Sequence, residues 1–205
     1  MEIRVNPTRM ELLRLKKRAA VAKRGHKLLK DKRDELMKTF LVLTRQARDL
    51  RKEVDDKLTT AYRSFLVARA VMSPEMLEEA IMFPKQKVSL TMSEKRMLNL
   101  TAPVFELHQE GEVYAYGLAN TSSELDTSLG IFSEVLSLMV KLAGVERSVE
   151  LLAEEIERTR RRVNALEHVL IPQLETAIKS ISMKLSEQER AATTRLMKIK
   201  DLIRK

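Results

Sequence analysis

A heptad pattern of apolar residues constrains this chain more than any other feature of its sequence. Between residues 36 and 54 the apolar positions recur with alternating gaps of four and three, and most residues between them are charged or polar. Such a repeat places one narrow apolar stripe along a helix, which a second helix of similar length must cover. The stripe consists of Leu36, Phe40, Leu43, Ala47, Leu50 and Val54, and Leu29, Ala22 and Leu15 extend it backwards in steps of seven.

The C-terminal half carries a second stripe of the same kind, with apolar residues seven apart from Val135 to Leu170. Two long amphipathic helices in one chain most simply fold back on each other. The predicted fold class is therefore all-α dominated, a long antiparallel two-helix coiled coil formed by the N- and C-terminal helices. The residues predicted for its seam are Leu15, Leu29, Leu36, Phe40, Leu43, Leu50, Val54, Val135, Leu142, Val149, Leu152, Ile156, Val163 and Leu166.

Helix start and stop signals divide the chain into three predicted parts. An N-terminal coiled-coil helix occupies residues 1–72, a central insert 73–121, and a C-terminal coiled-coil helix 122–205. Thr8 and Glu11 have the spacing of a capping box, and Ser73 followed by Pro74 is typical of a helix that stops and restarts.

In the insert, alternating polar and apolar residues over 88–101 predict a β-hairpin. Residues 104–105 and 113–116 form further β-prone patches, and a short helix runs to about residue 82. Pro172 is expected to kink the last helix and to remove one backbone hydrogen bond.

Composition limits the classes of protein that remain. The chain has 205 residues, of which 33% are charged and 4% aromatic, and it contains no Cys, which excludes disulfides and thiolate metal sites. No apolar run approaches the roughly 20 residues needed to span a bilayer. The net charge of +9 is uneven, because residues 1–33 and 184–205 are both strongly basic. Basic ends fit nucleic acid, an anionic membrane surface, or a protein partner with an acidic collar.

A search for catalytic motifs finds none. Gly25, His26 and Lys27 lack the earlier glycine that a phosphate-binding loop requires. The three histidines, His26, His108 and His168, are isolated in the sequence and are interpreted as surface or packing residues. We therefore expect no enzyme active site, no cofactor, no metal site and no directly bound nucleotide.

Two motifs resemble one known family. The stretch from Arg160 to Pro172 is similar to part of the C-terminal helix of the D subunit, the central rotor shaft of V-type and archaeal A-type rotary ATPases. The segments 7–12 and 25–36 resemble the other signature of that family. The family-motif residues in this sequence are Arg161, Arg162, Asn164, Glu167 and Pro172.

The resemblance implies a non-catalytic central-stalk component, cytoplasmic and peripheral to the membrane, that transmits torque between a hexamer of A and B subunits and an ion-translocating membrane ring. It implies as further partners the F subunit and the C (or d) subunit, which is the adaptor on the ring, with no nucleic acid and no membrane insertion. A rotating shaft favours many weak, replaceable contacts. The basic residues expected to contact the hexamer are Arg9, Arg14, Lys17, Arg18, Lys23, Arg24, Arg190, Arg195 and Lys198.

An alternative of another class is a basic coiled-coil protein that binds nucleic acid or acts as a scaffold. The charge of the two ends supports it, whereas the scarcity of aromatic residues, which stack on bases, argues against it. The slope of affinity against salt concentration separates the two hypotheses, because phosphate contacts make that slope steep and negative.

Overall fold

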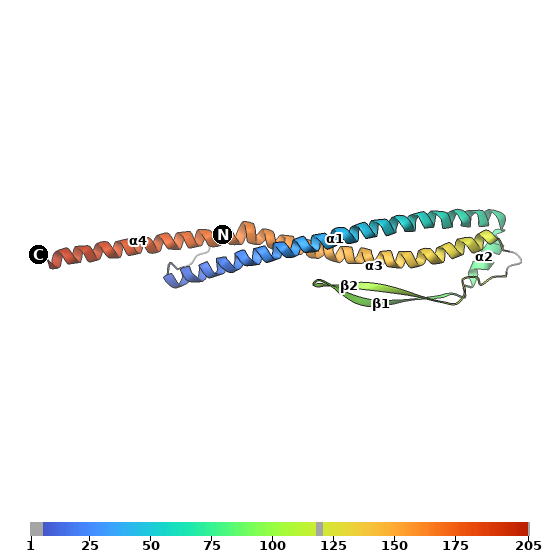
Figure 1. The fold of residues 1–205 in the computed structure, drawn as a ribbon, viewed down its shortest axis with the longest axis horizontal. Helices are drawn as coiled ribbons and strands as arrows, with labels where there is room; N and C mark the ends of the chain where they lie inside the picture. The colour runs from blue at the N-terminus through green and yellow to red at the C-terminus, as the bar shows by residue number, and fades with distance from the viewer. Residues whose placement is uncertain (1–5, 118–120, 205) are drawn as a thin grey trace. The chain divides into compact units, whose positions relative to one another are not determined.

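The structure, a computed structural model, describes residues 6–117 and 121–204. It confirms the predicted fold class of long N- and C-terminal helices with a small insert between them (Figure 1). The elements in chain order are α1 (Arg9–Val71), α2 (Pro74–Met82), β1 (Lys87–Met97), β2 (Leu100–Glu110), α3 (Ser123–Ala165), the π-helix η1 (Leu166–Leu170) and α4 (Ile171–Ile203).

The chain divides into two compact units, and α1 and α3 each contribute to both. The first unit comprises Met1–Leu36 and Glu155–Lys205, and the second comprises Met37–Glu154. The boundaries of the predicted insert lie close to helix ends, since α1 ends at Val71 and α3 begins at Ser123.

Side-chain caps explain where the first two helices begin. The Thr8 hydroxyl accepts a hydrogen bond from the Glu11 amide (3.2 Å), and the Ser73 hydroxyl accepts one from the Met76 amide (3.3 Å). Each cap satisfies one of the amides that have no partner within the helix. Pro74 opens α2, where its missing N–H costs nothing. The predicted stop and restart at Ser73 is therefore confirmed.

In the first unit, the start of α1 packs antiparallel to α4. A buried apolar cluster joins Leu15 and Ala19 to Leu174 and Ile181. Arg9 forms an ion pair with Glu189 and Lys23 forms one with Glu175, so residue numbers rise along one helix as they fall along the other.

The C-terminal helix is interrupted before Pro172 in a form that sequence reasoning did not predict. One π-helical turn, η1, separates α3 from α4, and Pro172 lies in the first turn of α4. In a regular α-helix the proline ring would clash with the carbonyl of the residue four positions earlier. A wider turn relieves this clash, so the expected disturbance is a π-turn that lies mainly N-terminal to the proline.

In the second unit, residues 37–71 of α1 pack antiparallel to residues 123–154 of α3. Arg51 pairs with Glu146 and Lys57 with Glu134. A buried cluster of Ala68, Met72, Leu77 and Leu125 joins the end of α1 to α2 and to the start of α3. Tyr62 and Phe65 meet the Phe132 ring edge to face.

The insert contains a longer hairpin than the sequence predicted. β1 and β2 pair antiparallel from Lys87 opposite Glu110 to Met97 opposite Leu100. The predicted hairpin over 88–101 was too short, because the second strand continues to Glu110 and includes the β-prone patch 104–105. The β-prone patch 113–116 forms no strand. Its residues support the core instead, as Tyr116 packs against the cluster around Leu125.

Strand β2 lies along α3 (Figure 1). The residues of α3 that it meets include the small Gly144 and Ser133. A methyl group placed on Gly144 would stand 3.5 Å from the Phe105 ring, and the Ser133 hydroxyl bonds to the Gln109 side chain. Small side chains at these positions let a strand approach the helix backbone. β1 is exposed along almost its whole length, so β2 is the strand that attaches the hairpin.

Candidate interaction surfaces

The structure places every residue predicted for the helix seam in a buried or half-buried position. The most buried in the first unit are Leu15, Leu36 and Val163, and in the second Val54, Val135 and Leu152. The apolar stripe is therefore the face that the paired helices turn away from solvent. Ile156 is also buried, and the half-buried members are Leu29, Phe40, Leu43, Leu50, Leu142, Val149 and Leu166.

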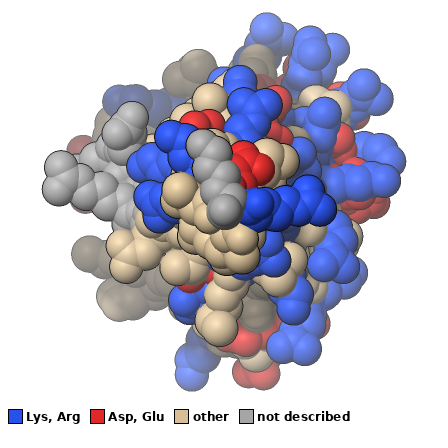
Figure 2. Space-filling view, turned by 90° about the vertical axis from the view of Figure 1, so that its left-hand side faces the viewer, with Lys and Arg blue, Asp and Glu red and all other residues tan. Residues whose placement is uncertain are grey.

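The basic residues predicted to contact a partner are all exposed. Three of them are engaged within the chain: Arg9 with Glu189 (2.6 Å), Lys23 with Glu175 (2.6 Å) and Arg14 with Glu11 (3.8 Å). The others form no ion pair with any residue that the structure describes, which leaves their charges available to a partner. They are Lys17, Arg18, Arg24, Arg190, Arg195 and Lys198. Lys and Arg side chains are seen on several sides in the view toward the end of α4 (Figure 2).

α4 continues past Glu189, which forms an ion pair with Arg9 of α1. From Arg190 to Arg204 every described residue is exposed, and these residues include Leu196, Ile199 and Leu202. These three apolar side chains recur at helical spacing beside basic ones. The end of α4 is thus a single amphipathic helix with no cover among the described residues.

His26 has a partner that sequence reasoning missed. Its Nε2 lies 3.2 Å from the Glu167 carboxylate oxygen on η1, and its side chain is only 20% exposed. No pattern in the sequence indicated this contact, because His26 and Glu167 are far apart in the chain and only helix pairing brings them together. A polar contact therefore occupies a position where the heptad pattern calls for an apolar one.

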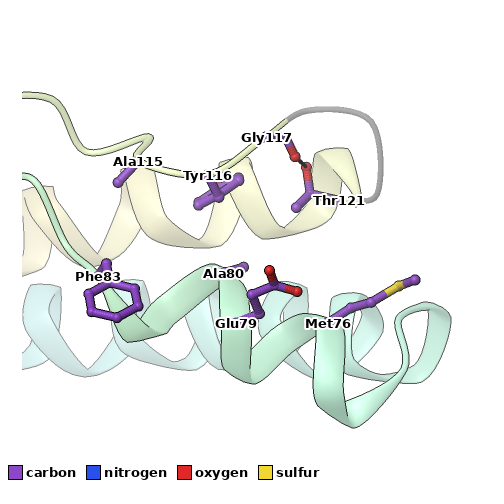
Figure 3. A pocket seen from close by; sticks show the side chains of 8 residues that line it. All are labelled: Met76, Glu79, Ala80, Phe83, Ala115, Tyr116, Gly117 and Thr121. Atoms are coloured by element: carbon purple, nitrogen blue, oxygen red, sulfur yellow. Dashed lines mark hydrogen bonds between the residues drawn. The ribbon is translucent and has the colours of Figure 1, made fainter.

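The second unit exposes an apolar surface on α2. Met76, Ile81, Met82 and Phe83 are all exposed, and Phe83 is 76% exposed. A cavity of about 360 Å³ opens beside them, with Met76, Glu79, Ala80 and Phe83 on the α2 side. Ala115, Tyr116, Gly117 and Thr121 line the other side (Figure 3). Exposed apolar side chains of this size around a hollow are typical of a protein contact surface.

Tyr116 connects the wall of this cavity to α3. Its hydroxyl donates a hydrogen bond to the Asp126 carboxylate (2.6 Å). Partial burial raises the pKa of the Tyr116 phenol well above its ordinary value, and the bond to Asp126 raises it further. Tyr116 is therefore a neutral donor at physiological pH, and its role here is to hold the chain against the helix.

The described residues offer no metal site, since no group of three or more His, Asp or Glu side chains could hold an ion. One helical stretch, Ser123–Ile203, contains an 18-residue window of mean hydropathy 1.6 that is 11% buried. This window is not an uninterrupted apolar run, which is why the sequence did not suggest it as a membrane span. By length and composition alone this helix could cross a membrane. One such helix in a chain is only weak evidence for a membrane span.

The comparisons with known proteins identify the family. A family model described as the D subunit of ATP synthase matches residues 11–201. The chain belongs to the family of ATP synthase D subunits. Three curated relatives are each named as the D subunit of a V-type ATP synthase. That of Acetivibrio thermocellus is 56% identical over 98% of this chain and 92% of the relative. That of Clostridioides difficile is 53% identical over 99% and 93%, and that of Clostridium botulinum strain Alaska E43 is 53% identical over 98% and 97%. The resemblance inferred from the two motifs is confirmed.

The motif residues of this D-subunit family member surround the π-turn. Arg161 is exposed and lies 3.4 Å from Glu157, one turn earlier on α3. Arg162 and Asn164 are exposed, Glu167 contacts His26, and Pro172 follows η1 directly. The motif thus lies where the α-helix changes to the π-helical turn η1 and back. Pro172 was the only residue in the sequence that indicated a disturbed helix at this place.

Proposed function

We propose that this chain is the non-catalytic central-stalk rotor subunit of a V/A-type ATPase. In this role it transmits torque between ATP hydrolysis, or synthesis, in the hexamer of A and B subunits and ion translocation by the membrane ring. The observation that carries the proposal is the pairing of α1 with the C-terminal helices in both units, through a buried apolar face flanked by ion pairs.

The pairing suits a shaft for a physical reason. Each well-buried Leu or Val of the seam contributes on the order of 1.5–3 kcal/mol, so the face common to both helices resists their separation under load. The ion pairs at its rim, such as Arg51 with Glu146, are exposed and contribute about 0–1 kcal/mol each. Stability therefore lies in the apolar face, and the polar exterior remains free to exchange partners.

The proposed hexamer contacts are the exposed basic residues of the first unit and the uncovered end of α4. The charges of Lys17, Arg18 and Arg195 are exposed and screened by salt, so each contact they make is weak. They can therefore contact several equivalent surfaces of the hexamer in turn without a deep free-energy minimum at any one of them. The amphipathic end of α4 supplies apolar contacts to the same partner.

The proposed contacts of the second unit are with the C (or d) subunit and the F subunit. The apolar surface of α2 around Phe83 suits the adaptor on the ring. The hairpin, with β1 uncovered, suits the F subunit or a role in setting the ATPase rate. On this proposal the protein is cytoplasmic and peripheral to the membrane, and a wash at alkaline pH releases it from membranes. An inserted helix would remain with the lipid.

Two matched pairs of variants test the shaft. Leu43→Asp and Leu152→Asp place a carboxylate on the buried face, whereas Val42→Asp and Ala153→Asp place it on the exposed side of the same turns. In the reconstituted complex, the first pair is expected to uncouple ATP hydrolysis from ion transport and the second to leave coupling intact. Coupled transport that is equal in all four variants would contradict the proposal.

Purification of the chain with its partners distinguishes the proposed rotor function from the alternative of nucleic-acid binding. We expect the chain to co-purify with a nucleotide-binding hexamer in stoichiometric amount. Tight binding of DNA or RNA with a steep negative salt slope, and no ATPase subunits in the purified material, would favour the alternative instead.

A further inference from the structure

The buried apolar core of the first unit is interrupted midway along the helix pair. In α1 no residue between Ala19 and Leu36 is fully buried. In the helical segment that pairs with it, no residue between Val163 and Leu174 is fully buried. On one side of this gap lies the cluster of Leu15, Ala19, Leu174 and Ile181, and on the other lie Leu36 and Val163. The gap is therefore flanked by packed segments and is not a frayed end.

Both helices are locally weak within this gap. Gly25 lies in the middle of α1, and apart from its chain neighbours and the adjacent helix backbone no atom of the described residues lies within 4 Å of where its Cβ would be, so neither packing nor a backbone turn requires a glycine. Glycine inside a helix favours local opening relative to alanine. Facing it, η1 and Pro172 replace the regular hydrogen-bonding pattern of the α-helix.

A polar contact holds the two weak points opposite each other. His26, next to Gly25, lies 3.2 Å from Glu167 in η1. The glycine and the π-turn therefore occupy the same level of the helix pair. A contact between partly exposed polar side chains permits small rotations that an interlocked apolar contact resists.

We propose that Gly25, His26 and the segment 166–172 form a compliant joint, at which the helix pair of the first unit bends and twists more readily than in the packed segments on either side. The joint is a property of this chain and can be tested without any assumption about rotation. Its use as an elastic element under torque rests on the proposed function.

Amide hydrogen exchange of the full-length chain tests the joint directly. We expect residues 164–171 to exchange about tenfold faster than residues 174–183, which carry the packed cluster. Equal protection of the two stretches would overturn the proposal whatever the ATPase data show. Because this comparison uses the unmodified chain, it tests the joint even if a variant fails to fold.

Variants with a matched control identify the residues that form the joint. Gly25→Ala adds a methyl group in open space and is expected to slow exchange over residues 22–29 about fivefold. Glu167→Ala is expected to speed exchange over 22–29 and 164–171, whereas Glu175→Ala, which breaks the ion pair with Lys23 beside the packed cluster, leaves both unchanged. Equal effects of the two glutamate variants, or no effect of Gly25→Ala, would contradict the assignment.

In the assembled complex, thermal fluctuations of a bead attached to the chain measure its torsional stiffness. Gly25→Ala is expected to narrow the angular distribution relative to the unmodified protein. A narrower distribution with unchanged coupling would support an elastic role, and an unchanged distribution would refute that role. Neither result would change the conclusion from amide exchange in the isolated chain, which tests the joint itself and not its elastic role.

Discussion

Thr159 offers a sharp test of how this helix pair is stabilised. Its side chain is fully buried in α3, and its hydroxyl has no hydrogen-bond partner among the described residues. A buried hydroxyl without a partner loses its bonds to water and gains nothing in exchange, at a cost of about 1–3 kcal/mol. Valine has nearly the same shape and lacks the hydroxyl. We therefore expect Thr159→Val to raise the free energy of unfolding by about 1–3 kcal/mol.

Urea denaturation followed by circular dichroism measures this change. Thr159→Ser is the matched control, because it keeps the hydroxyl, deletes a buried methyl group and should lower stability by about 1 kcal/mol. Thr176→Val is a second control at an exposed position, where the hydroxyl already bonds to the Pro172 carbonyl (2.9 Å). A Thr159→Val protein that is no more stable than the unmodified chain would refute the reasoning, since it would mean that the hydroxyl is satisfied in solution.

Two further predictions concern the insert. Leu98 has a φ of 55° in the hairpin turn, a region that costs non-glycine residues roughly 1–2 kcal/mol, so Leu98→Gly should stabilise the hairpin by about 1 kcal/mol, measured as slower amide exchange in β1 and β2. An equal or faster rate would argue against strain in the turn. The raised pKa of Tyr116 means that the unfolded chain releases the phenol proton first, so stability should fall as pH rises above about 10. Tyr116→Phe removes the phenol and should weaken this pH dependence in alkaline urea titrations, whereas an unchanged dependence would show that the titration of Tyr116 does not control it.

Local patterns in the sequence determined the helices and the faces that they bury. Apolar residues every three or four positions specify which side of a helix avoids water, and the caps at Thr8 and Ser73 specify where helices begin, because both effects act within one or two turns of the chain. The two family motifs were also legible, since they depend on residue identity alone. For these reasons the fold class and the family could be inferred before any coordinates were known.

Tertiary structure alone decided which residues meet. A heptad stripe does not specify its partner's register. The sequence therefore did not reveal that His26 contacts Glu167, or that the Thr159 hydroxyl has no partner among the residues the structure describes. The π-turn before Pro172 was hidden for a related reason, because a proline disturbs a helix in several ways and packing selects one of them. The hairpin shows the same limit, since alternation predicts a strand but not the small residues of α3 that β2 meets. Contacts between distant segments depend on three-dimensional proximity, which no local pattern encodes.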